Sequence, residues 1–166
     1  ITGISNAVLL NFYINKVKKV KINSLNFAGN NNIAEGKLKK QMKGTKEMMR
    51  FTLFPDKVTS PYGEVNKPLT IKQYFKEMAY LRPTRTKEYI DPYIRLKLGG
   101  GKFNENKYSD DKEKLIAYYN AQGYRDANIL ADTIINNQKG NLDIHIKLEE
   151  GHKYYFGNIS WKGNTK

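Results

Sequence analysis

The sequence predicts an α+β fold, on the evidence of three patterns. Between Ser109 and Gly123, apolar residues recur at the spacing of an amphipathic helix. Beyond Gly123 the pattern changes to an alternation of apolar and polar residues, which is typical of β-strands. The opening and closing segments of the chain also resemble each other, which indicates that one structural unit lies between them. In chain order, the predicted elements of this unit are strand, helix, long insertion, helix, strand and strand.

The composition describes a globular and strongly basic chain of 166 residues. A hydrophobic share of 39% is enough for a core, and no run approaches the roughly 20 apolar residues of a membrane-spanning helix. Lys and Arg number 29 against 16 Asp and Glu, which gives a net charge of +13. That excess either favours acidic partners, namely nucleic acid, an anionic membrane surface or an acidic protein, or simply keeps the chain soluble.

Cysteine is absent, which excludes disulfides and thiolate sites. Its absence fits both the cytosol and the oxidising periplasm. The chain opens in mid-pattern and lacks the composition of a signal peptide, so we expect it to be a fragment of a longer protein.

The first 27 residues predict two strands, separated by a lysine-rich stretch. The first alternates apolar and polar residues from Val8 to Ile14, and the second runs from Ile22 to Phe27 and leads into the turn at Gly29-Asn30. A shift of 134 residues carries Val8 onto Leu142, and it carries the later apolar positions onto apolar positions. It also carries Gly29-Asn30 onto Gly163-Asn164. We therefore predict that residues 1–19 end one repeat, that 20–150 form a complete repeat, and that 151–166 begin another.

After the first turn, a helix is predicted from Ile33 to Met42, with Ala34, Leu38 and Met42 on its buried face. Its lysines, Lys37, Lys39 and Lys40, together with Lys43, are interpreted as a solvated face rather than a nucleic-acid stripe. Residues 45–107 carry all five prolines and are interpreted as an insertion that partly folds on its own. Within it we predict a helix from Thr70 to Leu81, and aromatic packing by residues such as Phe51, Phe54 and Tyr93.

The second helix of the unit is expected to begin at Ser109, whose hydroxyl can cap a backbone N–H. Asp110 and Asp111 would then place negative charge at the positive end of the helix dipole. Gly123 should end the helix in the left-handed conformation, with Tyr124 packing back on Tyr119.

A β-hairpin is predicted next. Ile129, Ala131, Thr133 and Ile135 should face one side of its first strand, with Leu130 and Ile134 facing the other. Residues 136–140 form the turn, and the second strand runs from Leu142 to Glu149 with His145 on its wet face.

Three stretches carry a resemblance to a known family: FAGN at residues 27–30, YYNAQGYRDA at 118–127, and LEEGHKYYFGNISWKGNTK at 148–166. In their order and spacing they resemble the polypeptide-transport-associated (POTRA) repeats of the BamA outer-membrane assembly family, most closely its Bacteroidetes members. The resemblance implies a β-α-α-β-β unit with two helices on one face of a three-stranded mixed sheet. The insertion at about 45–107 departs from the family pattern. The landmark residues of the motif are Gly29, Asn30, Gly123, Tyr124, Arg125, Asp126, Gly151, Gly163 and Asn164.

The same resemblance implies a periplasmic part of an outer-membrane protein that binds unfolded outer-membrane protein precursors and docks accessory lipoproteins. In that family the first strand of the hairpin is a sheet edge, to which a client segment can add as a further strand. The edge residues expected here are Asn128, Ile129, Leu130, Ala131, Asp132, Thr133, Ile134 and Ile135. They include no proline and one charge, Asp132, which blunts the edge only slightly; a neighbouring repeat or the insertion covering this edge is the alternative.

Other candidate sites favour structural interpretations. Arg125 and Asp126 are expected to form a local ion pair or to bond the turn backbone, and Glu149-Glu150-Gly151 to set the angle between repeats through its turn geometry. Neither histidine, His145 or His152, has the spacing of a metal site. We therefore expect no enzyme, no cofactor and no metal. A basic nucleic-acid-binding module is the alternative function, and contact with the membrane surface is a weaker option.

Overall fold

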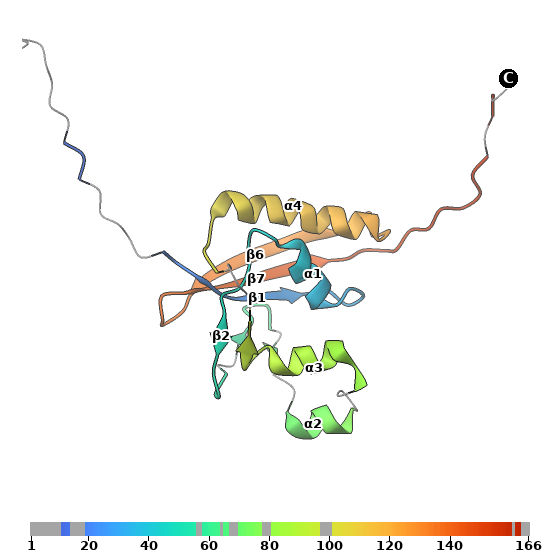
Figure 1. The fold of residues 1–166 in the computed structure, drawn as a ribbon. Helices are drawn as coiled ribbons and strands as arrows, with labels where there is room; N and C mark the ends of the chain where they lie inside the picture. Colours follow the sequence, from blue (N-terminus) through green and yellow to red (C-terminus); the bar gives the residue numbers. More distant parts are fainter. Residues whose placement is uncertain are drawn as a thin grey trace, which may run out of the picture.

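The computed structural model of this chain describes residues 11–13, 19–55, 58–63, 65–66, 70–77, 81–96, 101–160 and 162–163. Its central sheet contains β1 (Ile22–Ala28), β6 (Asn128–Asn136) and β7 (Leu142–Glu149), in the order β1-β7-β6. The middle strand, β7, pairs with β1 in parallel and with β6 in antiparallel orientation. The α+β class with a three-stranded mixed sheet is therefore confirmed, and Figure 1 shows the strands side by side.

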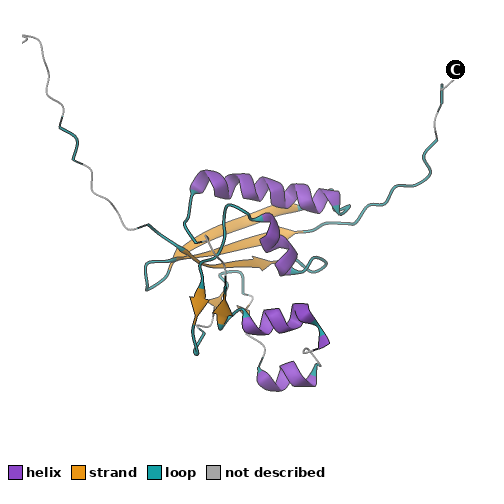
Figure 2. Ribbon diagram, in the orientation of Figure 1, coloured by secondary structure: helices purple, strands orange, loops and turns teal. Residues whose placement is uncertain are grey.

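Two helices, α1 (Glu35–Gln41) and α4 (Glu105–Ala121), cover one face of this sheet (Figures 1 and 2). The core lies between the helices and the sheet, because alternate strand residues and one stripe of each helix point into the same space. Its fully buried members include Ile22, Leu25, Leu38, Met42, Leu115, Tyr119, Ile144 and Ile146.

Helix α4 begins earlier than the sequence pattern predicts. Its N-cap is Asn104, whose side chain accepts a hydrogen bond from the N–H of Lys107, and Ser109 lies inside the helix. The prediction of Ser109 as the cap is wrong because Asn104 offers an equally good capping oxygen one turn upstream.

The end of α4 confirms the prediction. Gly123 has a φ of +96°, and the N–H of Tyr124 donates to the carbonyl of Tyr119 over 3.0 Å. Because the N–H of Gly123 also donates to Asn120, both bonds of a Schellman motif are present. The rings of Tyr119 and Tyr124 pack edge to face, with their centroids 6.0 Å apart.

Helix α1 is shorter than the predicted segment from Ile33 to Met42. Ala34 is its exposed N-cap, whereas Ile33 is buried just before the helix starts. Lys39 does not point freely to solvent, since its ammonium lies 2.8 Å from Glu35 and 3.0 Å from Glu47. Burial alone would lower the pKa of Lys39, but the Glu47 and Glu35 carboxylates outweigh burial and raise it.

The insertion forms small elements on the opposite side of the sheet from α4 (Figure 1). These are the paired strands β2 (Arg50–Phe51) and β5 (Ile94–Arg95), the paired strands β3 (Val58–Thr59) and β4 (Val65–Asn66), and the helices α2 (Ile71–Lys76) and α3 (Pro83–Ile90).

The predicted helix from Thr70 to Leu81 is thus cut short at α2, and Met78 lies outside the described residues. Phe51 and Phe54 are largely exposed, whereas Tyr93 packs against Tyr89 as predicted, and Tyr89 stacks on Tyr74. The prediction that Phe51 and Phe54 pack the insertion is therefore wrong.

Arg95 and Glu47 join the insertion to the sheet. The Arg95 guanidinium lies 3.3 Å from the Glu47 carboxylate and 2.7 Å from that of Asp91, and it donates to the carbonyl of Asn23 at the start of β1. Glu47 in turn accepts the N–H of Leu25 over 3.0 Å. Because Arg95 and Glu47 are both buried, their ion pair is shielded from solvent and orients the insertion on β1.

His145 is buried, with only 2% of its surface exposed, which corrects its predicted place on a wet face. The face of β7 that carries it lies toward the insertion, and its neighbours there, Ser24 and Asn26 on β1, are also buried. Alternation in the sequence identified the two faces correctly, but it could not show that the polar face is covered.

The end segments form no strands in the described residues. Residues 11–13 and 154–160 have no regular secondary structure, and most of the predicted strand from Val8 to Ile14 lies outside the described residues. A first or last strand pairs with other strands of its own repeat, so the assignment of 1–19 and 151–166 to neighbouring repeats stays a prediction.

Candidate strand-binding site

Strand β6 lies at an edge of the central sheet. Within the described residues it pairs with β7 on one side and with no strand on the other. An edge strand directs alternate N–H and C=O groups outward, where a further extended segment can bond them. The segment singled out from the sequence, residues 128–135, coincides with β6 apart from its last residue.

A β-bulge interrupts the pairing near the start of β6. Ile129 is paired with Leu148 and Ala131 with Lys147, so Leu130 has no partner in the register. The extra residue moves Ile129 onto the helix-facing side together with Asp132 and Ile134, while Thr133 stays on the opposite side. The prediction that Ile129 and Thr133 lie on the same face of the strand is therefore wrong, because the bulge interrupts the two-residue alternation.

Between β6 and α4 lies a groove of about 570 Å³. Apolar side chains from both elements contribute to its lining, and Leu130 is about half exposed beside it. Lys112, Glu113 and Asp132 also line it, so it carries charges of both signs. The remaining lining residues are Ile116, Ala117, Asn120, Asn128, Ile129 and Ala131. The groove runs along the open edge, and an added strand would place alternate side chains in it.

Asp132 ties the edge strand to α4. Its carboxylate lies 2.8 Å from the Lys112 ammonium and accepts the hydroxyl of Tyr108 over 3.0 Å. The bond from Lys112 holds the pKa of Asp132 below its usual value, although partial burial opposes this effect. Burial and the Asp132 carboxylate together raise the pKa of Tyr108, so its hydroxyl stays a donor. Asp132, the one charged residue of the edge segment, is thus paired with a residue of the same domain.

A tyrosine of the insertion contacts β6. The hydroxyl of Tyr62, between β3 and β4, lies 2.8 Å from that of Thr133, and the Lys147 ammonium lies 5.8 Å from the centre of the Tyr62 ring. Thr133 points away from α4, so this contact reaches the face of the strand and not the groove.

Two of the landmark glycines, Gly29 and Gly123, follow β1 and α4 and have positive φ values. Gly29 has a φ of +83°, and a Cβ there would lie 2.0 Å from the carbonyl oxygen of Leu148, so β1 can end beside β7 only with glycine at this position. Asn30 donates to the carbonyl of Ile33. Gly151 follows β7, and Gly163 lies near the end of the described chain. Asn164 lies outside the described residues.

The adjacent pair Arg125 and Asp126 is positioned differently from the prediction. Asp126 accepts a hydrogen bond of 2.6 Å from the hydroxyl of Tyr154, in the segment that follows β7. Arg125 is exposed. Asp126 thus bonds the chain beyond the sheet rather than the turn backbone.

Glu150 and Asp111 are buried acidic residues whose roles the sequence analysis missed. Glu150 accepts hydrogen bonds from the N–H groups of Asn32 and Ile33 and from the hydroxyl of Tyr119. Asp111 accepts the N–H groups of two residues after α1, Gly44 and Thr45, each over 2.7 Å. Both positions were detectable, because Glu150 continues the buried alternation of β7 and Asp111 falls on the buried stripe of α4.

Metal and membrane-spanning features are absent from the part of the chain that the structure describes. There, no three His, Cys, Asp or Glu residues are grouped so that they could hold a metal ion. No helix among the same residues has the length and apolar character needed to cross a bilayer.

Comparison with known proteins supports the resemblance seen in the sequence. Residues 82–151 match the POTRA family, described as a surface antigen variable number repeat. The chain is 38% identical over 64 residues to the outer membrane protein assembly factor BamA of Neisseria meningitidis serogroup B; the alignment covers 38% of this chain and 8% of that protein. A crystal structure of Haemophilus influenzae BamA POTRA3-5 is also similar, with a TM-score of 0.46 and 19% identity over 81% of this chain and 35% of that one.

This chain spans a small part of the length of these relatives. The matched residues 82–151 contain α4, β6 and β7, which form the candidate site. In this part of the chain, residues 82–151 match the POTRA family, and 64 residues of the chain are similar to a BamA protein.

Proposed function

We propose that this chain is a periplasmic module of an outer-membrane β-barrel assembly factor and that it holds unfolded outer-membrane protein precursors by strand addition to β6. The observation that carries the proposal is the open edge of β6 beside an apolar groove. The family match and the similarity to BamA support the assembly role.

Strand addition suits a receptor for many clients. Main-chain hydrogen bonds supply affinity with little dependence on sequence, while alternate side chains of the client enter the groove between α4 and β6. Strands of membrane barrels alternate apolar and polar residues, so one face of such a strand matches the apolar lining of the groove. The bulge at Leu130 interrupts the regular pairing of β6 with β7.

The proposal also includes partners other than the precursors. Accessory lipoproteins of the assembly complex would dock on the module, and its net charge of +13 would favour contact with an anionic membrane surface. Its place would be the periplasmic side of the outer membrane.

A proline at Leu130 tests the edge directly. Leu130 has no partner on β7, so Leu130→Pro removes one amide of the edge strand at a bulge, where proline is tolerated. Binding of a fluorescent peptide with an alternating barrel-strand sequence should weaken by about tenfold, measured by anisotropy. Leu130→Val keeps the amide and is the matched control. Equal binding by both variants, with unchanged circular dichroism, would contradict strand addition.

Crosslinking in cells tests the client. Photoreactive residues placed at Leu130 and Ile134, which are both exposed, should trap barrel precursors. The same probe at Lys87, exposed on α3, is the control. No trapping at any β6 position, or equal trapping at Lys87, would contradict the proposal.

Nucleic-acid binding remains the alternative, because of the net charge of +13. It predicts an affinity that falls steeply as salt rises, through the release of counterions. A gel shift at moderate salt that retains no complex would exclude it.

A further inference from the structure

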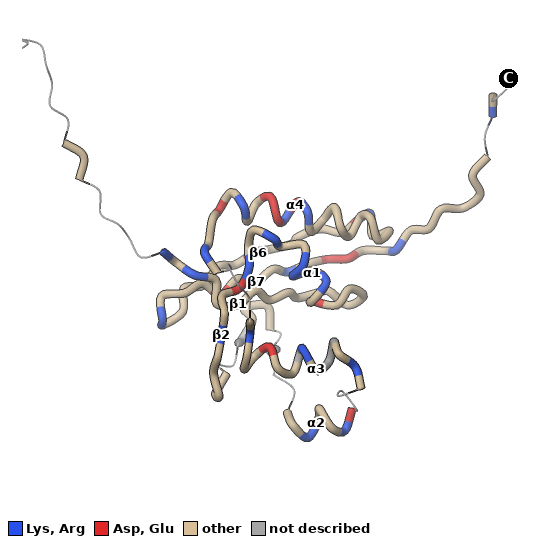
Figure 3. Tube along the Cα trace, in the orientation of Figure 1, with Lys and Arg blue, Asp and Glu red and all other residues tan. Residues whose placement is uncertain are grey.

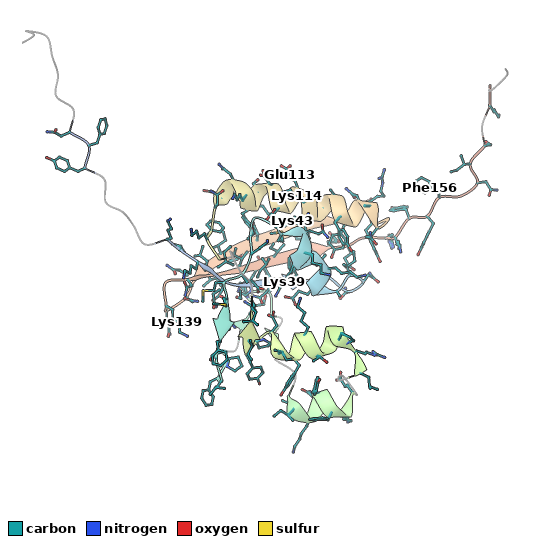
Figure 4. The ribbon with its side chains drawn as sticks, in the orientation of Figure 1. Lys39, Lys43, Glu113, Lys114, Lys139 and Phe156 are labelled. Atoms are coloured by element: carbon teal, nitrogen blue, oxygen red, sulfur yellow. The ribbon has the colours of Figure 1, made fainter. Side chains whose placement is uncertain are left out.

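A second concavity, which we call the lysine pocket, lies beside the first turn of α4. Its volume is about 460 Å³, and it is lined by residues just before β1, just after α1 and around the start of α4. Its lining contains five lysines and no acidic residue; the lysines are Lys19, Lys43, Lys46, Lys102 and Lys107. Figure 3 shows basic positions along the segments that lead into β1 and α4, and Figure 4 labels Lys43.

All five of these side chains are exposed, and none of them has a carboxylate partner among the described residues. The groove between α4 and β6 is different, because its lining contains two carboxylates, Glu113 and Asp132, beside the ammonium of Lys112. Like charges that converge on a concave surface without counter-charges raise its positive potential and concentrate anions there. The positive charge of the lysine pocket is therefore a local concentration of lysines, which the overall basic composition does not explain.

One wall of the lysine pocket is fixed to α4. Asp111 accepts the N–H groups of Gly44 and Thr45, and so holds the loop that carries Lys43 and Lys46 against the helix. A Cβ on Gly44 would lie 2.8 Å from the Cβ of Lys107, so the missing side chain permits this close approach. The backbones of these lysines are therefore held in place before any ligand arrives.

The other wall is fixed by backbone bonds between distant segments. Ile22 donates its N–H to the carbonyl of Gly101 over 2.6 Å, and Phe103 donates to that of Val20 over 3.2 Å. Lys21 and Lys102 form an isolated antiparallel bridge between the same segments. This pairing sets Lys19 and Lys102 beside the loop of Lys43 and Lys46, and a site held in this way loses less entropy on binding.

We propose that the lysine pocket binds phosphate, carried either by a lipid headgroup or by a soluble phosphate. Lysine ammonium groups are compact charges that bind phosphate oxygens through charge-assisted hydrogen bonds. Val20 and Phe103 line the same concavity and offer apolar contact to the part of the ligand that bears the phosphate. Strand addition at β6 does not involve these residues, so either proposal can fail without the other.

Matched charge variants of the whole chain test this site. The pocket variant carries Lys43→Gln, Lys46→Gln and Lys102→Gln. The control variant carries Lys72→Gln, Lys76→Gln and Lys87→Gln, at exposed positions on α2 and α3 with the same change in net charge. Thermal unfolding, followed by circular dichroism, confirms that both variants fold.

The probes are inorganic tripolyphosphate, measured by calorimetry, and flotation with phosphatidylcholine vesicles that contain or lack phosphatidylglycerol. We expect the pocket variant to bind at least one probe about tenfold more weakly than the unmodified chain, and the control variant to stay within about threefold. Loss confined to phosphatidylglycerol vesicles identifies a lipid headgroup as the source, and loss of tripolyphosphate binding identifies a soluble phosphate.

Three results would overturn the proposal. The first is that the unmodified chain binds neither probe, and the second is that both variants weaken binding equally. A single-stranded oligonucleotide that binds more tightly than tripolyphosphate, and that both variants weaken alike, would indicate a diffuse nucleic-acid surface instead of a phosphate site.

Discussion

Buried acidic side chains hold the separate elements of this domain together. Glu150 bonds the loop before α1 and the end of α4, Asp111 bonds the loop after α1, and Glu47 bonds β1 and Arg95. In each case a carboxylate accepts the backbone N–H of a buried residue, namely Ile33, Thr45 and Leu25 respectively. Removing such an acceptor leaves these donors unpaired, which costs more than the net gain from an ordinary hydrogen bond.

We expect Glu150→Ala to lower the free energy of unfolding by about 2 to 4 kcal/mol, because the N–H groups of Asn32 and Ile33 lose their acceptor. Glu149→Ala, at the exposed neighbouring position, should change stability by less than about 0.5 kcal/mol. Urea unfolding of both variants measures the difference. Equal stability of the two would show that Glu150 is only a turn residue.

His145 should make stability depend on pH. Burial lowers its pKa from the ordinary value of 6.5, which Asp143 opposes only partly, so the unfolded chain binds the proton more strongly. The stability contributed by neutral His145 is then fully present above about pH 6.5 and is lost as pH falls below it. Each unit by which the pKa is lowered corresponds to about 1.4 kcal/mol.

The measurement is urea unfolding of the unmodified chain and of His145→Gln from about pH 8 to pH 5. The unmodified chain should lose more stability on acidification than the variant. His152→Gln, at an exposed position, should behave like the unmodified chain. Parallel pH profiles for the unmodified chain and His145→Gln would disprove this role.

At the scale of elements, glycine has opposite effects in the two helices. Gly123 ends α4 in the left-handed conformation, and a Cβ there would lie 2.8 Å from the carbonyl oxygen of Tyr154. Gly36 lies inside α1, and no atom lies within 4 Å of where its Cβ would be. The same substitution therefore should destabilise the chain at one glycine and stabilise it at the other.

We expect Gly123→Ala to destabilise the chain by about 1 to 2 kcal/mol and Gly36→Ala to stabilise it by about 0.5 to 1 kcal/mol. Thermal unfolding of the two variants measures both changes in stability. A destabilising Gly36→Ala would mean that α1 does not form over Glu35–Gln41.

The periodicity of the sequence was most informative where an element depends on its own residues. The end of α4 at Gly123 and the alternation of β7 were predictable, because the cap and the alternation depend on neighbouring residues. The start of α4 and the bulge at Leu130 were not. Asn104 and Ser109 both suit a cap, and nothing in an alternating run marks which residue will be extra.

Considering the whole molecule, the insertion is coupled to the sheet through Arg95. We expect Arg95→Met to speed hydrogen exchange in β2, β5 and α3 by about 10- to 100-fold, while β6 and β7 keep their protection. The reason is that Arg95 bonds Glu47, Asp91 and the carbonyl of Asn23 at once. Lys87→Met, at an exposed position on α3, is the control.

Mass spectrometry of peptic fragments resolves these segments. Equal acceleration in β6 and β7 would show that insertion and sheet unfold together. No acceleration anywhere would show that the ion pair does not hold the insertion.

The sequence by itself determined the basic charge, the helix that ends at Gly123, the hairpin of β6 and β7, and the residues of the candidate edge, because composition, caps and alternation are local properties. The tertiary structure decided that the face of β7 carrying His145 is covered, that Asp111 and Glu150 are acceptors inside the domain, and that five lysines surround one pocket. These features join residues far apart in the chain. Their positions depend on how the sheet, the helices and the insertion pack, and no short window of sequence contains that information.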